Sequence, residues 1–201
     1  AVPLGVLAAW KAHTWIDRGV MLFAVMGFSV PVFVIGYVLM WVFSLTLGWF
    51  PVQGYKPIGE GIGPFLSSIA LPTLALGLVY VALIARMTRA SVMEVLTEDY
   101  IRTARAKGVN NRTLLMRHAL KNASVPIVTI IGVGVALLIG GVVVTESVFN
   151  IPGLGRLTID AVLRRDYPII QGVILIFSGI YVLVNLVIDL SYTVLDPRIR
   201  Y

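Results

Sequence analysis

The stretch VPIVTIIGVGVALLIGGVVV, residues 125–144, decides the fold of this chain. It has no charged residue in 20 positions, and a helix of that length, at about 1.5 Å per residue, matches the hydrocarbon thickness of a bilayer. Predominantly apolar stretches at 20–47, 65–85 and 168–195 accompany it. The sequence therefore predicts an all-α, polytopic transmembrane bundle with four complete spans.

Composition supports a membrane protein. The chain has 201 residues, of which 58% are hydrophobic and 13% charged, and its mean hydropathy is +0.92, whereas a soluble domain has about 25% charged residues. The net charge of +6 is typical of basic loops between spans, so we expect the lipid bilayer, and no nucleic acid, as a partner. The absence of cysteine excludes disulfides, thiolate zinc sites and iron–sulfur ligation.

The first 18 residues contain an apolar run and a polar connector. Residues 1–9 are too few to span, and we interpret them as the end of a helix whose beginning is absent from this sequence; an interfacial segment is the alternative. Residues 10–18 contain two tryptophans, which are typical of membrane interfaces. His13 and Asp17 lie four residues apart, but two ligands do not make a metal site. We expect a solvated connector.

The stretch 20–47 is longer than a bilayer requires, because a continuous helix over it would measure about 42 Å. Pro31 and Gly36 predict a kink or a close helix contact within it. The next segment, 48–64, is rich in Gly and Pro and is predicted to be an extramembrane loop. Its closely spaced glycines lack the Lys-Ser/Thr of a phosphate loop, so no nucleotide site is expected there.

Basic residues concentrate in one segment, 86–124, which we call the basic island. It holds eight of the 16 Lys and Arg residues. With alternating loops, 12 basic residues fall on the side of the island and four on the other side. By the positive-inside rule, the island and the C-terminus are predicted to be cytoplasmic.

Within the island, the pattern predicts two short helices joined by a turn. Ser91 and Glu94 fit a capping box, and Thr97 is a second possible start. Gly108 suits the end of the first helix, and Asn110 or Asn111 the start of a second that runs to about Lys121. The following span is then expected to begin at Val125, with Pro126 in its first turn.

Two carboxylates are candidate functional groups. Asp189 lies within the last span, one turn from Asn185, where an ionisable group indicates a proton relay or a structural anchor near the span end. Glu146 lies at the outer end of a glycine-rich span, where it either faces a translocation path or is an interfacial carboxylate. No metalloprotease, EF-hand, P-loop or serine-hydrolase motif occurs, so we expect no catalytic residue and no metal site.

Five segments resemble the permease subunits of ABC importers for dipeptides and oligopeptides. They are DYIRTARAKG at 99–108, RHALKNA at 117–123, ESVFNIPGLGR at 146–156, RDYP at 165–168 and LDPRIRY at 195–201. They occur in order across essentially the whole chain. Such permeases usually have six spans, so the resemblance implies a chain that lacks the first span and part of the second.

Importer permeases in general carry an E-A-A-x-x-x-G loop followed by I-x-L-P. Aligned on Gly108, the E-A-A positions are Arg102, Thr103 and Ala104, and the I-x-L-P positions are 118–121. Only Ala104, Gly108 and Leu120 keep the general pattern. These departures match the peptide-importer branch.

The resemblance implies that the island docks on cytoplasmic ATPases. Small residues there permit close approach, and basic ones offer charges to carboxylates of the partner. The implied coupling residues are Tyr100, Arg102, Thr103, Ala104, Arg105, Lys107, Gly108, Asn111 and Arg112. The implied residues of the translocation path are Glu146, Asn150 and Arg156.

The resemblance also implies the rest of an assembly. It includes a second homologous permease, two cytoplasmic ABC ATPases and an extracytoplasmic peptide-binding protein, in a bacterial or archaeal inner membrane. This chain would need no cofactor, since ATP and Mg would bind to the ATPases, and it would not itself be an enzyme. Relatives of this branch also move nickel chelates, glutathione or sugars. A proton-coupled secondary transporter using Asp189 and a non-transporting membrane scaffold are the alternative functions.

Overall fold

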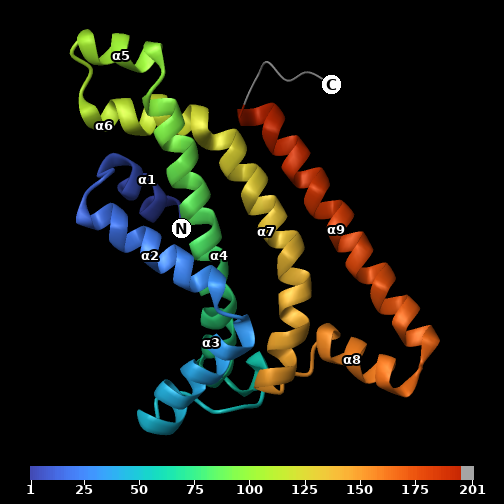
Figure 1. The fold of residues 1–201 in the computed structure, drawn as a ribbon. Helices are drawn as coiled ribbons and strands as arrows, with labels where there is room; N and C mark the ends of the chain where they lie inside the picture. Colours follow the sequence, from blue (N-terminus) through green and yellow to red (C-terminus); the bar gives the residue numbers. More distant parts are fainter. Residues whose placement is uncertain (196–201) are drawn as a thin grey trace. The chain divides into compact units, whose positions relative to one another are not determined.

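The computed structural model describes residues 1–195, and every regular element among them is a helix (Figure 1). The long helices are α4 (Ile62–Leu96), α7 (Leu120–Phe149) and α9 (Tyr167–Leu195). The shorter ones are α1 (Val2–Trp10), α2 (Trp15–Ser29), α3 (Val32–Leu39), η1 (Met40–Thr46), η2 (Ile58–Glu60), α5 (Asp99–Ala106), α6 (Asn111–Thr113), η3 (Leu114–Ala119) and α8 (Leu154–Arg164).

The all-α membrane class predicted from the sequence is confirmed. Three helices are long and apolar enough to cross a membrane, or four if α2 and α3 with η1 form one broken span. The prediction of four complete spans and a partial one stays a prediction. The assignment of residues 1–201 to a single permease domain also stays a prediction.

The chain forms two compact units. Unit 1 contains Ala1–Phe28, Tyr80–Gly134 and Leu183–Tyr201, and unit 2 contains Ser29–Val79 and Val135–Val182. The helices α4, α7 and α9 each contribute residues to both units. Each unit has its own core.

The core of unit 1 joins the N-terminal helix to the island. Its buried residues are Val6, Ala9, Val92, Leu115, Ala119, Ala123 and Ile127. The helix α1 approaches α4 closely because Gly5 has no side chain: a Cβ there would lie 2.6 Å from the carbonyl oxygen of Ala85. In the same unit, the hydroxyls of Thr129 in α7 and Tyr192 in α9 lie 2.8 Å apart. Helices distant in sequence therefore support the segment that follows the island.

The core of unit 2 forms around Phe149 at the end of α7. Met40, Leu71 and Ala75 are buried with it. The carbonyl oxygen of Phe149, which the helix itself leaves unpaired, accepts the backbone N–H of Gly54 at 3.0 Å. The loop 48–61 thereby closes the C-terminal end of α7.

The expectation of one continuous helix over 20–47 is wrong. The helix α2 ends at Ser29, and α3 starts after Pro31, which is its N-cap residue. Proline has no N–H to donate and disfavours the helical conformation of the residue before it. At Pro31 these two effects break the helix instead of kinking it.

The helix α4 extends beyond the predicted apolar stretch 65–85 into the basic island. The helix continues past Arg86 and Arg89 to Leu96, since arginine is a good helix former and only the apolar segment ends there. Ser91 is buried inside α4 and so caps no helix start. The capping-box interpretation of Ser91 and Glu94 is therefore wrong.

The second island helix is not separate from the span that follows. Residues 111–149 form one continuous helical segment of 39 residues, which begins as α6, widens to a π-helix in η3 and continues as α7. Pro126 lies inside α7 and not in a first turn. Interior proline is tolerated in membrane helices where neighbouring groups satisfy the freed carbonyl. The predicted end near Lys121 is therefore wrong.

The C-terminal motif lies outside the described residues. The segment LDPRIRY at 195–201 contributes only Leu195 to the described part of the chain. The predicted cytoplasmic C-terminus thus falls outside the described residues.

Candidate functional site: a basic helical hairpin

The helix α5 is an amphipathic element anchored by one side chain. Its eight residues, DYIRTARA, bury Ile101, which is only 1% exposed, while Ala104 is half-buried. The other six residues of the helix are exposed. A single buried apolar side chain therefore anchors α5, whose place in the fold Figure 1 shows, and leaves its polar and basic residues exposed.

Gly108 ends α5 as the sequence predicts. Its φ of 77° lies in the left-handed region, which glycine adopts without steric cost. The N–H of Gly108 donates to the carbonyl of Arg105 at 3.0 Å, and the N–H of Val109 donates to Ala104 at 3.2 Å. This pair of bonds is the Schellman motif. A Cβ at Gly108 would meet no atom within 4 Å, so the backbone there is open to a partner.

The helix α6 begins at an asparagine cap. The side-chain oxygen of Asn110 accepts the backbone N–H of Arg112 at 3.1 Å, so of the two candidates Asn110 is the cap. Asn111 and Arg112 are exposed at the start of the helix. Leu114 and Leu115, which the sequence places on an apolar face, are both buried. We call residues 97–121 the basic hairpin.

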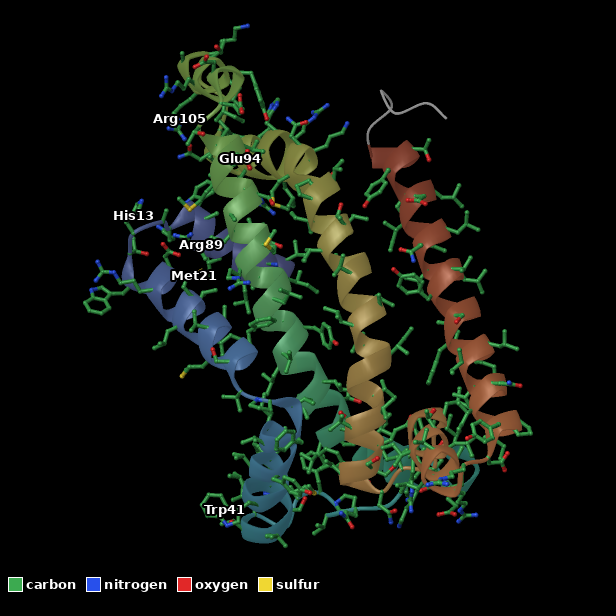
Figure 2. All side chains as sticks on the ribbon, turned by 45° about the vertical axis from the view of Figure 1, so that its right-hand side comes forward. His13, Met21, Trp41, Arg89, Glu94 and Arg105 are labelled. Atoms are coloured by element: carbon green, nitrogen blue, oxygen red, sulfur yellow. The ribbon has the colours of Figure 1, made fainter. Side chains whose placement is uncertain are left out.

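The charges of the hairpin are largely unpaired within the chain. Arg102 lies 3.6 Å from Asp99, but both side chains are highly exposed, and such surface pairs contribute little to stability. Arg105, which Figure 2 places at the α5 end of the structure, and Lys107 form no ion pair within the described residues. These cations are thus available to carboxylates outside the chain.

A hydrogen bond joins the hairpin to α7, and sequence reasoning missed it. The side-chain amide of Asn122 donates to the hydroxyl of Tyr100 at 2.6 Å. The two residues lie 22 positions apart, so no periodicity relates them. Tyr100 therefore connects α5 directly to the first turn of the long helix.

All nine predicted coupling residues lie on the hairpin. Tyr100 to Arg105 are on α5, Lys107 and Gly108 form its C-terminal turn, and Asn111 and Arg112 open α6. Thr103 donates its hydroxyl to the carbonyl of Asp99 at 3.0 Å and so stays within its own helix. Their role in coupling stays a prediction.

The predicted path residues also lie together, in unit 2. The carboxylate of Glu146 accepts the backbone N–H of Arg156 at 2.9 Å, and the guanidinium of Arg156 donates to the side-chain oxygen of Asn150. Arg156 is the third residue of α8, so Glu146 caps the start of that helix. A Cβ at Gly153 or Gly155 would crowd this carboxylate, which explains both glycines.

Asn150 ends α7 in the left-handed conformation. Its φ is 55°, and the N–H of Ile151 reaches back to the carbonyl of Glu146 at 2.9 Å. Asparagine replaces glycine at such helix ends because its short polar side chain tolerates this conformation. The segment 146–156 therefore comprises the end of α7, a turn at 150–153 and the start of α8, and its three candidates have structural roles independent of any path.

The connector at residues 10–18 is mostly exposed, as expected, but one of its residues, Asp17, forms an ion pair in unit 1 that was not expected. Asp17 is buried, and its carboxylate binds the guanidinium of Arg89 at 2.5 and 2.7 Å. Figure 2 shows Arg89 on α4 and His13 on the connector. No specific sequence signal indicated this contact, because Asp17 stands beside the charged Arg18 and lies 72 positions from Arg89.

Helices that can span a membrane, together with a basic hairpin held outside their apolar segments, define a polytopic membrane component. The model of the family "Binding-protein-dependent transport system inner membrane component" matches residues 1–201. The chain belongs to this family, which confirms the resemblance.

Similar proteins share the full length of this chain. A probable peptide ABC transporter permease protein of Sinorhizobium fredii is 56% identical over 200 residues, covering 100% of this chain and 64% of the relative. A putative peptide transport system permease protein of Brucella abortus is 46% identical with the same coverage. A glutathione transport system permease protein of Escherichia coli is 47% identical, covering 98% of this chain and 62% of the relative. The chain thus spans less than two thirds of the length of these relatives.

Proposed function

We propose that this chain is part of the permease subunit of an ATP-driven ABC importer for dipeptides or oligopeptides. The observation that carries the proposal is the basic hairpin, whose α5 is anchored by Ile101 and exposes its cations. Arg102 forms only an exposed ion pair with Asp99, and Arg105 forms none within the described residues. A surface of this kind suits docking to carboxylates of another protein. The family and the peptide-transport names of two relatives support the substrate class.

The hairpin would act as the coupling element. ATP binding and hydrolysis would occur in two cytoplasmic ATPase subunits, and movement of the docked hairpin would pass to α7 through the Tyr100–Asn122 bond and the continuous helix 111–149. The resulting rigid-body motion would alternate access to the path. A second homologous permease would complete that path and cover apolar residues of α9, where Val173 alone is buried among the described residues.

Gly108→Arg tests the docking role. The variant adds a bulky cation at the open backbone of the hairpin, so we expect normal membrane insertion of the complete permease with loss of ATP-driven peptide uptake. Gly48→Arg is the matched control, because Gly48 also has a positive φ, of 67°, and no atom within 4 Å of its Cβ position. Normal uptake by Gly108→Arg, or equal loss in both variants, would contradict the assignment.

Competition tests the substrate class. We expect unlabelled dipeptides and oligopeptides to compete with a labelled peptide for uptake by the complete importer. Glutathione is the informative competitor, because one relative is named a glutathione transport system permease protein. Uptake of glutathione without uptake of ordinary peptides would overturn the peptide assignment while leaving the permease assignment intact.

The two alternative functions, a proton-coupled secondary transporter and a non-transporting membrane scaffold, gain no support. Asp189, the proposed proton carrier, is exposed on α9, and the family match is to a binding-protein-dependent system. Uptake that survives ATP depletion and collapses with the proton gradient would favour the secondary transporter.

A further inference from the structure

Unit 1 contains a groove that shares only Arg112 with the predicted coupling residues. It has a volume of about 660 Å³ and lies between α1 and the segment formed by α6 and η3. Its lining consists of Val2, Pro3, Val6, Leu7, Trp10, Lys11, Arg112, Leu115, Met116 and Leu120. The walls are therefore apolar except for two cations.

The two cations have no counter-charge among the described residues 1–195. No acidic residue lines the groove, and within residues 1–195 neither Lys11 nor Arg112 forms an ion pair. Lys11 is the C-cap residue of α1 and Arg112 lies in α6, 101 positions away in the sequence, and both line the groove because α1 packs against the hairpin. A groove with this lining is complementary to a molecule that has both an apolar chain and an anionic group.

The exposed side of α1 forms one wall. Val6 turns towards the core of unit 1, whereas Leu7 and Trp10 are 44% and 36% exposed. Tryptophan is enriched where a protein crosses the boundary between hydrocarbon and headgroups. Trp10, an aromatic residue of the kind found at membrane interfaces, and the cation Lys11 are therefore neighbours at the end of the apolar wall.

We propose that this groove binds an anionic phospholipid, with an acyl chain along the apolar wall and the phosphate between Lys11 and Arg112. Basic pockets between membrane helices bind anionic headgroups in this way. A free phosphate ion would leave the apolar wall uncovered, and a zwitterionic lipid would bring a positive group next to the two cations. The proposal concerns the membrane that surrounds the protein, and it overlaps with the proposed coupling role only at Arg112.

Photo-cross-linking in the complete permease tests the proposal. The complex is reconstituted in phosphatidylcholine with a trace of phosphatidylglycerol or of phosphatidylcholine that carries a photoreactive acyl chain, and labelled peptides are identified by mass spectrometry. We expect phosphatidylglycerol to label segments 2–11 and 112–120. Since each nearby cation changes the affinity for an anionic lipid about fivefold, we expect labelling by phosphatidylcholine to be at least fivefold weaker.

Three variants distinguish lipid binding in the groove from nonspecific attraction of anionic lipids to basic residues. Lys11→Gln should reduce labelling of the two segments about fivefold. Lys121→Gln, which removes the same charge from an exposed residue outside the groove, should leave it unchanged. Leu7→Trp should reduce labelling by filling the groove while both cations remain. The labelling assay requires neither ATP nor peptide. A negative labelling result would therefore count against the lipid site and not against the transport assignment.

The opposite results would overturn the proposal. Equal labelling by the two lipids, or labelling that Lys11→Gln does not change, would show that the cations select no headgroup. Absence of label from both segments would show that protein, from the complete chain or a partner, covers the groove.

Discussion

Asp17 of α2 and Arg89 of α4 form a two-point ion pair, with Oδ1 to Nε at 2.5 Å and Oδ2 to Nη2 at 2.7 Å. The side chains are 5% and 22% exposed. Oδ2 also accepts the backbone N–H of His13 at 2.9 Å, and the φ of His13 is 65°. Asp17 therefore holds the turn between α1 and α2 against α4, and so supports one wall of the groove.

Removal of Asp17 should strongly destabilise unit 1. In Asp17→Ala the guanidinium of Arg89 stays mostly buried without its counter-charge, so we expect a loss of about 3 kcal/mol in the free energy of unfolding. Arg89→Lys should cost less, because it keeps the charge and loses only the two-point geometry. Thermal unfolding of the complete permease in detergent measures both changes.

The double variant Asp17→Ala/Arg89→Ala provides the control. If the two residues act through each other, their combined loss should be smaller than the sum of the single losses by about 1 to 3 kcal/mol. Additive losses would show that each residue acts through other contacts.

Glycine-to-alanine substitutions should separate close backbone contacts from open positions. At Gly155 a Cβ would lie 2.5 Å from Cα of Val143, and a backbone atom cannot move aside as a flexible side chain can. We expect Gly155→Ala to cost about 1 to 3 kcal/mol. Gly172→Ala in α9, where no atom lies within 4 Å, should be neutral or stabilise by up to about 1 kcal/mol through helix propensity. Equal melting temperatures for the two variants would contradict this contact.

Substitution of Glu146 should distinguish a helix cap from a path residue. Glu146→Ala removes the acceptor for the N–H of Arg156, so we expect a loss of about 1 kcal/mol and faster hydrogen exchange at the start of α8. Glu146→Gln keeps an acceptor and should retain most of the protection. If Glu146→Gln abolished peptide uptake with exchange unchanged, the carboxylate would have a role in the path beyond capping.

Loss of the Tyr100 hydroxyl should uncouple the hairpin from α7 with little effect on folding. Tyr100→Phe removes a partly exposed hydrogen bond to Asn122, which is worth about 0.5 to 1.5 kcal/mol. We expect peptide-stimulated ATPase activity of the complete importer to fall while the amount of assembled complex stays the same. Tyr167→Phe, a similar change at an exposed residue of unit 2, is the control. Unchanged stimulation in Tyr100→Phe would show that coupling does not use this bond.

Local patterns predicted much of the hairpin correctly. Gly108 ends α5 and Asn110 caps α6 as expected, since both depend on the conformational preferences of single residues. The same reasoning failed at Ser91, which has the spacing of a capping box but lies inside α4. A capping-box pattern indicates only that a helix can start at that position. The residues around Ser91 favour helix, so α4 continues through it.

The candidate path residues show a different limit of sequence reasoning. Glu146, Asn150 and Arg156 were correctly grouped, because they occur within one short segment. Their observed hydrogen bonds link the end of α7 to the start of α8, and α8 itself was not predicted. Without that helix, no pattern could show that the carboxylate of Glu146 caps it.

The sequence by itself determined the membrane class, the apolar segments and the position of the basic island, because hydropathy and charge add up residue by residue along the chain. Only the tertiary structure decided that Asp17 pairs with Arg89, 72 positions away, and that Lys11 and Arg112 face the same groove. These contacts depend on how α1 and α2 pack against α4 and the hairpin. Packing brings together residues that no local period relates, and for that reason the sequence alone could not predict them.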